Sequence, residues 1–255
     1  MFTPVSDSQI QQQLQPRLES LSAMSARLLA LSPLPAAFLS SLEHKLRIEL
    51  THGSTAIEGN TLTLRETQLL IDEGITPQGA KQLREIHETI NHHRAVLRLQ
   101  EIVREGGRCD ESALGELHRL IMANIEDGRA GAYRTERVLV TGAPLQPIRP
   151  ETIPEAMQEL SQWIETSDLH PVMLAGEAHY RFVKIHPFYD GNGRPARLLF
   201  NGVLLSNRYP LTVIPAEARS RYITSIDEAD RGRPLRYFEL LCECVESSLD
   251  QYLSA

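Results

Sequence analysis

Leucine and other apolar residues recur every three or four positions along most of this chain, and this spacing constrains its fold more than any other feature. Near the N-terminus the series is Leu14, Leu18, Leu21 and Leu28, and the proline-containing segment 32–35 interrupts it. A second series then follows, through Leu39, Leu42, Leu46 and Leu50. Residues three or four apart share one face of an α-helix. The pattern therefore predicts a mostly helical chain.

Signals for helix ends divide the rest of the chain. The second helix is expected to end near Glu58, because Gly59 and an asparagine follow it. Thr63 and Glu66 have the spacing of a capping box, which predicts a short helix ending at Gly74. Other helices are expected over about 78–105, 110–125, 171–184, 216–229 and 234–253, with one starting near 152 and one following the loop 186–193.

The segment from Tyr133 to Pro150 differs from its surroundings. It contains the short β-rich run 138–140, and glycine and prolines follow at 142, 144, 147 and 150. Short apolar runs bounded by such residues are typical of hairpins. We therefore expect one irregular β-hairpin on an all-α body. No proline-, glycine- or serine-rich linker separates two domains.

Bulk composition excludes several classes of protein. The 255 residues carry a net charge of -7, which argues against a nucleic-acid partner, because such binding needs a basic face. No run approaches the roughly 18 apolar residues of a membrane span, and the polar N-terminus does not read as a signal peptide. The three cysteines, 109, 242 and 244, do not suggest a disulfide framework. A cytoplasmic location is therefore expected.

The segment from His186 to Arg197 concentrates groups suited to phosphate chemistry. Gly191 and Gly193 flank Asn192 just before a helix. Glycines let the backbone turn so that several N–H groups face one concavity, and a helix N-terminus adds a positive dipole end. The backbone alone therefore predicts an anion site.

The side chains of the same segment extend this prediction. Arg194 and Arg197 lie three apart on one helical face, and two guanidinium groups suit a polyphosphate. Asp190 offers a hard oxygen ligand for Mg²⁺. His186 can accept a proton near neutral pH. The residues alone thus indicate a metal-assisted polyphosphate site with a base.

The same run, His-Pro-Phe-Tyr-Asp-Gly-Asn-Gly-Arg-Pro-Ala-Arg, resembles the signature of Fic-domain proteins at each of its fixed positions. The resemblance extends from about Ser54 to the C-terminal helix and includes the segments 131–135 and 170–171. It implies a Fic-type helical bundle. The implied division is an N-terminal helical extension over 1–50, an inhibitory helix end over 51–62 and a Fic catalytic domain over 63–255.

The resemblance also implies an activity, which is transfer of AMP from ATP to a Ser, Thr or Tyr hydroxyl of a target protein, with release of pyrophosphate. Glycine at 191 favours AMP transfer over phosphocholine transfer or phosphorylation. Phe188 would anchor the loop in the core. The implied roles are His186 as base, Asp190 as Mg²⁺ ligand, Gly191, Asn192 and Gly193 as the anion hole, and Arg194 and Arg197 as ligands of the outer phosphates.

Two further regions acquire roles by the same resemblance. Tyr222 and Asp230 stand where the family lines the adenine pocket, although asparagine is common at the second position. A flap beside the motif would hold the target segment by strand addition. The candidate flap residues are Val138, Leu139, Val140, Thr141 and Gly142.

The segment from Ser54 to Asn60 resembles the inhibitory motif of the family. Glu58 would pair with Arg197 in the place of the γ-phosphate and leave ATP misaligned for attack. Ser54, one helical turn earlier, would hydrogen-bond near Arg194 or Arg197. A glutamate at a helix C-terminus is unfavourable against the helix dipole, which independently suggests a tertiary partner for Glu58.

Three other functions compete with AMP transfer. Removal of AMP from a modified protein uses the same site, with Glu58 positioning water. A non-catalytic nucleotide-sensing module would bind ATP without releasing pyrophosphate. A DNA-binding regulator ranks lowest, because no basic recognition helix is visible. The expected partners are ATP and a hydroxyl-bearing protein, with no nucleic acid and no membrane. A homodimer that modulates the inhibition by Glu58 is left open.

Overall fold

The computed structural model describes residues 5–77, 82–139 and 146–254, and over these ranges its regular elements are ten α-helices and three short 3-10 helices. The prediction of a mostly helical chain is confirmed. The α-helices are α1 (Ser8–Ala30), α2 (Ala36–Ile57), α3 (Leu64–Glu73), α4 (Leu83–Arg104), α5 (Glu111–Met122), α6 (Ile153–Thr166), α7 (Pro171–Ile185), α8 (Gly193–Ser206), α9 (Arg219–Asp230) and α10 (Leu235–Leu253), and the 3-10 helices are η1 (Asp127–Arg129), η2 (Pro150–Thr152) and η3 (Ala216–Ala218).

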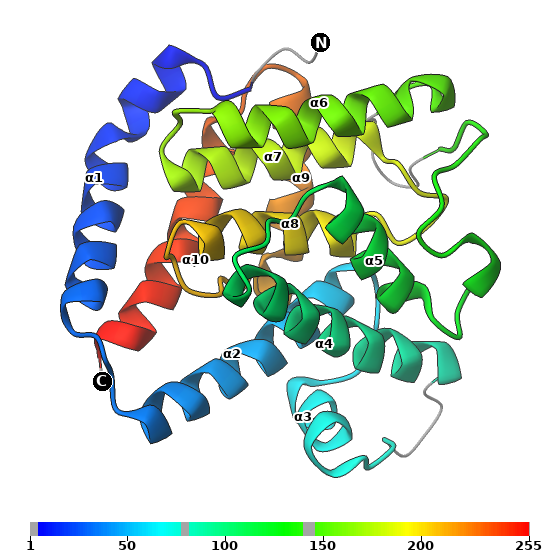
Figure 1. Cartoon of the computed structure of the whole chain (residues 1–255), viewed down its shortest axis with the longest axis horizontal. Coiled ribbons are helices and arrows are strands. Elements are labelled where there is room, and N and C mark those ends of the chain that lie inside the picture. The colour runs from blue at the N-terminus through cyan, green and yellow to red at the C-terminus, as the bar shows by residue number, and fades with distance from the viewer. Residues whose placement is uncertain (1–4, 78–81, 140–145, 255) are drawn as a thin grey trace.

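Helices α7 and α8 lie side by side at the centre of the molecule and are buried on nearly all sides (Figure 1). Such burial requires helices that are apolar around most of their circumference. Helix α1 packs along α10, and α2 packs along α4. The hydrophobic core includes residues of α1 and α2, so the extension predicted over 1–50 packs on the same core as the later helices. The loop that joins α7 to α8 therefore connects the two most deeply buried helices of the described structure.

Several helix ends form where the sequence places them. The hydroxyl of Thr63 accepts from the N–H of Glu66 at 3.2 Å, and the Glu66 carboxylate accepts from the N–H of Thr63 at 2.8 Å. Gly74 ends α3 with φ of 66°, a conformation that glycine adopts at low cost. Asp110 caps α5 through the N–H of Ala113 at 2.9 Å. These capping predictions are confirmed.

The hairpin predicted between Tyr133 and Pro150 is not seen where the structure describes this segment. Residues 133–139 and 146–149 form no strand. Val138 and Leu139 are among them, and the Leu139 side chain is 95 % exposed. The remaining flap residues, Val140, Thr141 and Gly142, lie outside the described residues.

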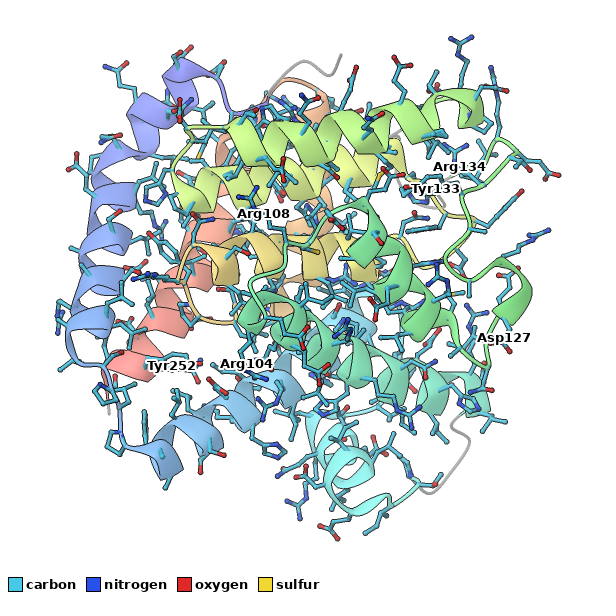
Figure 2. All side chains as sticks on the ribbon, viewed as in Figure 1. Arg104, Arg108, Asp127, Tyr133, Arg134 and Tyr252 are labelled. Carbon is cyan, nitrogen blue, oxygen red and sulfur yellow. The ribbon has the colours of Figure 1, made fainter. Side chains whose placement is uncertain are left out.

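The guanidinium of Arg134 explains how the segment is held without a strand ladder. This side chain is buried, and it donates to the carbonyls of Glu136, Ile148 and His186 at 2.9, 2.6 and 2.7 Å. An isolated two-stranded hairpin is marginal in water. Figure 2 shows Arg134 and its neighbour Tyr133 where this segment meets the helical body. One buried arginine thus supplies the cross-links that backbone pairing would have supplied.

In the part of the chain that the structure describes, no helix has both the length and the apolar character needed to cross a membrane. The three cysteines, Cys109, Cys242 and Cys244, are free and buried. Burial raises the pKa of each thiol to about 12. They pack as small apolar side chains rather than as reactive thiols.

Histidines whose pKa is lowered in the folded protein, among them His179 and His93, link the stability of the fold to pH. Burial, with the charge of Arg197 added, lowers the pKa of His179 to about 3, and burial with Arg47 lowers that of His93 to about 4. Both values rise to about 6.5 on unfolding, so between about pH 4 and 6.5 the unfolded chain binds more protons. Stability is therefore expected to fall as the pH decreases from 7 to 5, by at most about 1.4 kcal/mol per pH unit for His179.

Thermal unfolding followed by circular dichroism across this pH range measures the effect. His93→Gln removes one of these groups and should reduce the dependence, whereas His87→Gln on the same helix should not. A melting temperature that rises on acidification would contradict the assignment.

Candidate active site

The loop between α7 and α8 is built around one buried phenylalanine and one asparagine. His186 ends α7 in the left-handed conformation, with φ of 50°, which turns the chain out of the helix. Phe188 is fully buried. The side chain of Asn192 accepts from the N–H of Phe188 at 2.9 Å and donates to its carbonyl at 2.8 Å. The loop therefore has a defined shape before any ligand binds.

His118 supports this loop from α5, and sequence spacing assigned it no role. Its ring stacks on Phe188 with centroids 3.7 Å apart. Its Nδ1 accepts from the N–H of Gly131 at 2.8 Å, so its Nε2 carries the proton and donates to the Asp190 carbonyl at 3.0 Å. Burial lowers the pKa of His118 to about 4, which keeps this neutral tautomer. Only tertiary contacts reveal the role of this histidine.

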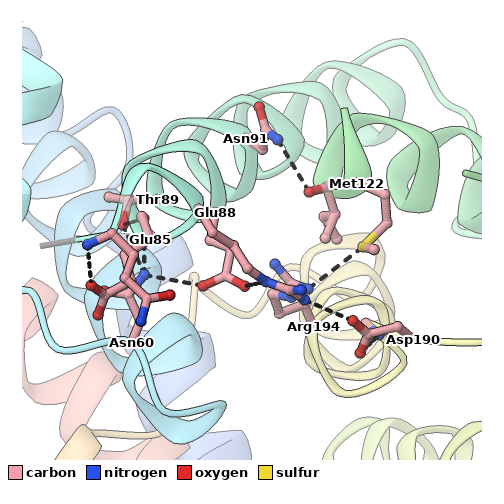
Figure 3. Close-up of polar contacts among 12 residues, drawn as sticks. Asn60, Glu85, Glu88, Thr89, Asn91, Met122, Asp190 and Arg194 are labelled. Atoms are coloured by element: carbon pink, nitrogen blue, oxygen red, sulfur yellow. Dashed lines mark hydrogen bonds and ion pairs between the residues drawn. The ribbon is translucent and has the colours of Figure 1, made fainter. Parts of the chain in front are cut away.

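Arg194 is a buried cation whose hydrogen-bonding capacity is mostly unused. Its side chain is 2 % exposed, and its Nε and Nη1 have no partner in the described structure. Its Nη2 lies 3.6 Å from Sδ of Met122 (Figure 3). The carboxylates of Asp190 and Glu88 act electrostatically on this arginine, but both form their ion pairs with Arg84. A buried guanidinium left largely unpaired is costly, which indicates a site prepared for an anion.

Arg197, in contrast, forms hydrogen bonds with residues at the end of α2. Its Nε donates to Oγ of Ser54 at 2.8 Å, and its Nη2 donates to the Ser54 carbonyl and to Oε1 of Glu58, each at 2.7 Å. Burial alone would lower the pKa of Arg197, but the charge of Glu58 and the contacts with Tyr222 raise it. The structure therefore brings Ser54, Glu58 and Arg197 together.

The Glu58 carboxylate also covers the N-terminus of α8. A Cβ atom at Gly193 would clash with Oε1 of Glu58, so the carboxylate lies directly against this backbone. The first N–H groups of a helix have no acceptor within it, and they attract anions. Asn60 fixes the turn after Glu58 by donating to the Glu85 carbonyl at 2.9 Å. Glu58 thus stands where an anionic ligand of Arg197 would bind.

Asp190 is the carboxylate available to a cation. Its side chain is half-exposed, Oδ1 accepts from the N–H of Gly191 at 2.6 Å, and Oδ2 pairs with Arg84 at 2.8 Å. Burial would raise the pKa of Asp190, but these hydrogen bonds and the charge of Arg194 together lower it. The described residues contain no group of three or more metal-binding side chains. A single ionised carboxylate fits Mg²⁺, which takes its other ligands from phosphate and water.

His186 has the properties of a base that is neutral at physiological pH. Burial, reinforced by the charge of Arg134, lowers its pKa to about 4. Its carbonyl accepts from Nε of Arg134 at 2.7 Å, which holds the residue in its left-handed conformation. The imidazole therefore remains able to accept a proton well below pH 7.

The two residues expected near adenine also form contacts within the protein. Tyr222 is 3 % exposed, and its hydroxyl lies 2.6 Å from Nε2 of His179, with its ring behind Arg197. The Asp230 carboxylate accepts from the Tyr180 hydroxyl at 2.9 Å and forms an ion pair with Lys184. The N–H of Gly191, expected in the anion hole, binds Asp190 instead.

The N-terminus of α8 is lined by two buried arginines, and the preceding loop carries a carboxylate and a neutral histidine, an arrangement whose charges suit an anionic ligand. Residues 108–204 match the Fic/DOC family. A Fic domain-containing signalling protein from Bacteroides thetaiotaomicron is 31 % identical, with a TM-score of 0.80 over 92 % of this chain and 94 % of that one. The chain belongs to the Fic/DOC family.

Other relatives are longer proteins. The protein adenylyltransferase Fic of Drosophila erecta is 33 % identical over 94 % of this chain and 48 % of its own length. The protein adenylyltransferase fic-1 of Caenorhabditis elegans is 32 % identical over 80 % of this chain and 41 % of its own length. The chain thus spans about half the length of these relatives. The structure of C. elegans Fic-1 has a TM-score of 0.84 at 27 % identity, over 94 % of this chain and 72 % of that one.

Proposed function

We propose that this protein transfers AMP from ATP to a hydroxyl group of another protein, and that Glu58 restrains this reaction. The observation that carries the proposal is the pair of buried arginines at the N-terminus of α8. In the described structure Arg194 has two guanidinium nitrogens without a hydrogen-bond partner, and Arg197 pairs with Glu58. Two such cations are suited to the outer phosphates of a nucleotide. The names of the adenylyltransferase relatives support AMP as the transferred group.

In the proposed reaction the hydroxyl oxygen of the target attacks the α-phosphorus of ATP. The bond between this phosphorus and the oxygen bridging to the β-phosphate breaks, and pyrophosphate leaves. His186 accepts the hydroxyl proton, as its neutral imidazole permits. Arg194 and Arg197 hold the outer phosphates and neutralise charge that develops on the leaving group. Asp190 would hold Mg²⁺, which supplies further neutralisation of phosphate charge when bound.

Glu58 restrains this reaction by pairing with Arg197, the cation that would otherwise bind the γ-phosphate. Its carboxylate pairs with Arg197 and covers the backbone at Gly193. A nucleotide that enters must displace this carboxylate or bind with its phosphates shifted.

The direct experiment is mass spectrometry of a cell lysate treated with the Glu58→Gly protein, ATP and Mg²⁺. AMP adducts on Ser, Thr or Tyr that are absent with the Glu58→Gly,His186→Asn protein would support the proposal. Treated samples without adducts, in which the protein nonetheless binds ATP, would favour a nucleotide-sensing module instead.

Removal of AMP from a modified protein is the second candidate. It is favoured by the position of Glu58, whose carboxylate is 38 % exposed and lies at the same helix N-terminus. Release of AMP from a modified target by the wild type, and not by Glu58→Gly, would support this direction.

Arg84 is expected to compete with Mg²⁺ for Asp190. The guanidinium lies at the start of α4 and donates to Oδ2 of Asp190 at 2.8 Å and to Glu88 at 3.0 Å. Arg84→Gln should lower the Mg²⁺ concentration for half-maximal labelling about two- to fivefold, in keeping with the modest strength of exposed ion pairs. Titration of Mg²⁺ in the Glu58→Gly background measures this. Arg98 also lies on α4, but it pairs with Glu116 of α5. Arg98→Gln should therefore leave the Mg²⁺ concentration for half-maximal labelling unchanged. A higher requirement in Arg84→Gln would contradict the competition.

A further inference from the structure

A chain of buried hydrogen bonds leads from Tyr222, which lies beside Arg197, into the core. The guanidinium carbon of Arg197 on α8 lies 5.9 Å from the ring centroid of Tyr222 on α9. The Tyr222 hydroxyl lies 2.6 Å from Nε2 of His179 on α7. Nδ1 of His179 lies 2.7 Å from the hydroxyl of Tyr237 on α10, which also contacts the Gly176 carbonyl at 2.9 Å. Helices α7, α9 and α10 are linked by this chain.

The direction of each hydrogen bond follows from the Gly176 carbonyl, at the inner end of the chain. A carbonyl can only accept, so the single Tyr237 proton goes to Gly176. Nδ1 of His179 must then donate to the Tyr237 oxygen. A neutral imidazole has one proton, so Nε2 accepts from the Tyr222 hydroxyl. The Tyr222 oxygen is therefore left with free lone pairs beside the positive charge of Arg197, an arrangement that this charge favours.

While Arg197 is in place, the donor–acceptor directions of these hydrogen bonds are fixed. The side chains of His179 and Tyr237 are fully buried, and Tyr222 is 3 % exposed. A protonated His179 would donate from Nε2 to the Tyr222 oxygen. The Tyr222 proton would then point toward the guanidinium of Arg197, which also carries only donors, and the two groups would repel each other. Burial and the charge of Arg197 lower the pKa of His179 to about 3, which excludes that state at neutral pH.

The other contacts of Arg197 come from α2. Ser54 and Glu58 occupy its Nε and Nη2, and Glu58 is the group that a bound phosphate would replace. Tyr222 contacts the guanidinium from α9, a helix that carries neither Ser54 nor Glu58. This contact therefore does not require Glu58.

We propose that His179 and Tyr237 are positioning residues for the nucleotide: through Tyr222 they hold Arg197 where it meets the outer phosphates. The inference rests on the proposed function, because it requires a nucleotide whose outer phosphates reach Arg197. Loss of a group that acts on the outer phosphates lowers the affinity for ATP and leaves the affinity for AMP unchanged. A general loss of structure would lower both affinities.

The test uses Tyr237→Phe, which removes one hydroxyl and keeps the buried ring. In the Glu58→Gly background, calorimetric titration should show ATP affinity reduced about three- to tenfold, the effect expected from the loss of one buried hydrogen bond in the chain. AMP affinity should change less than twofold. Tyr252→Phe, another buried tyrosine on α10, should alter neither. Nitrogen-15 NMR adds a signature: His179 should carry its proton on Nδ1 in the parent and shift toward Nε2 in Tyr237→Phe.

Tyr222→Phe is the second variant, and it should show the same selective loss for ATP. An equal loss for AMP and ATP in either variant, or unchanged ATP affinity in a folded Tyr237→Phe protein, overturns the positioning role. A parent that does not bind ATP contradicts the proposed function itself. These outcomes are therefore distinguishable.

Discussion

Glu58→Gly is expected to raise the rate of AMP transfer about 10- to 150-fold. The Glu58 carboxylate forms a charge-assisted hydrogen bond of 2.7 Å with Arg197, whose side chain is buried. Hydrogen bonds to charged groups contribute roughly 1.5 to 3 kcal/mol, which corresponds to this range of rates when the contact must be broken for productive binding. The same substitution frees the backbone N–H groups at the start of α8 for the nucleotide.

The rate of auto-modification with labelled ATP measures this effect. Glu58→Gln keeps the length of the side chain but removes its charge, so it should give an intermediate rate. Glu73→Gly changes another exposed glutamate at a helix end, in α3, and should leave the rate at the wild-type value. Equal labelling in the wild type and in Glu58→Gly would remove the basis for the brake.

His186→Asn, introduced into the Glu58→Gly protein, is expected to lower the labelling rate by at least about 100-fold. General-base catalysis contributes about 10² to 10⁴ in rate, and we assign that role to no other residue. Asparagine is the appropriate replacement because His186 has φ of 50°, and asparagine tolerates this left-handed conformation better than alanine does. The loss should therefore reflect the base rather than backbone strain.

ATP affinity separates the base from the phosphate-binding groups. It should stay within about threefold in His186→Asn, because the cations assigned to the phosphates, Arg194 and Arg197, are unchanged. His44→Asn, on α2 and paired with Asp72, provides a histidine control outside the site. Labelling by His186→Asn at the parent rate would show that another group takes the proton.

Local signals in the sequence predict much of this fold. The helices follow the apolar periodicity, and their ends follow capping residues such as Thr63, Gly74 and Asp110, because these interactions lie within a few residues along the chain. The loop from His186 to Arg197 is readable for the same reason. Its glycines, carboxylate and arginines are contiguous, and the helix start positions them together.

Contacts between distant segments are not predictable in this way. His118 and Arg134 hold the loop by contacts with Phe188 and His186, and no spacing in the sequence marks either of them. The hairpin prediction relied on a short β-branched run, whereas a buried arginine decides the conformation of the described part of that segment. Tyr222 was assigned to an adenine pocket by position alone, and the structure places its hydroxyl against His179.

The fate of the individual phosphates of ATP tests the proposed transfer most directly. The Glu58→Gly protein should be incubated with lysate and with ATP labelled at either the α- or the γ-phosphate. Transfer of AMP predicts that the α label appears on protein and is lost in Glu58→Gly,His186→Asn, while the γ label leaves in pyrophosphate. Appearance of the γ label on protein, without the α label, would contradict AMP transfer.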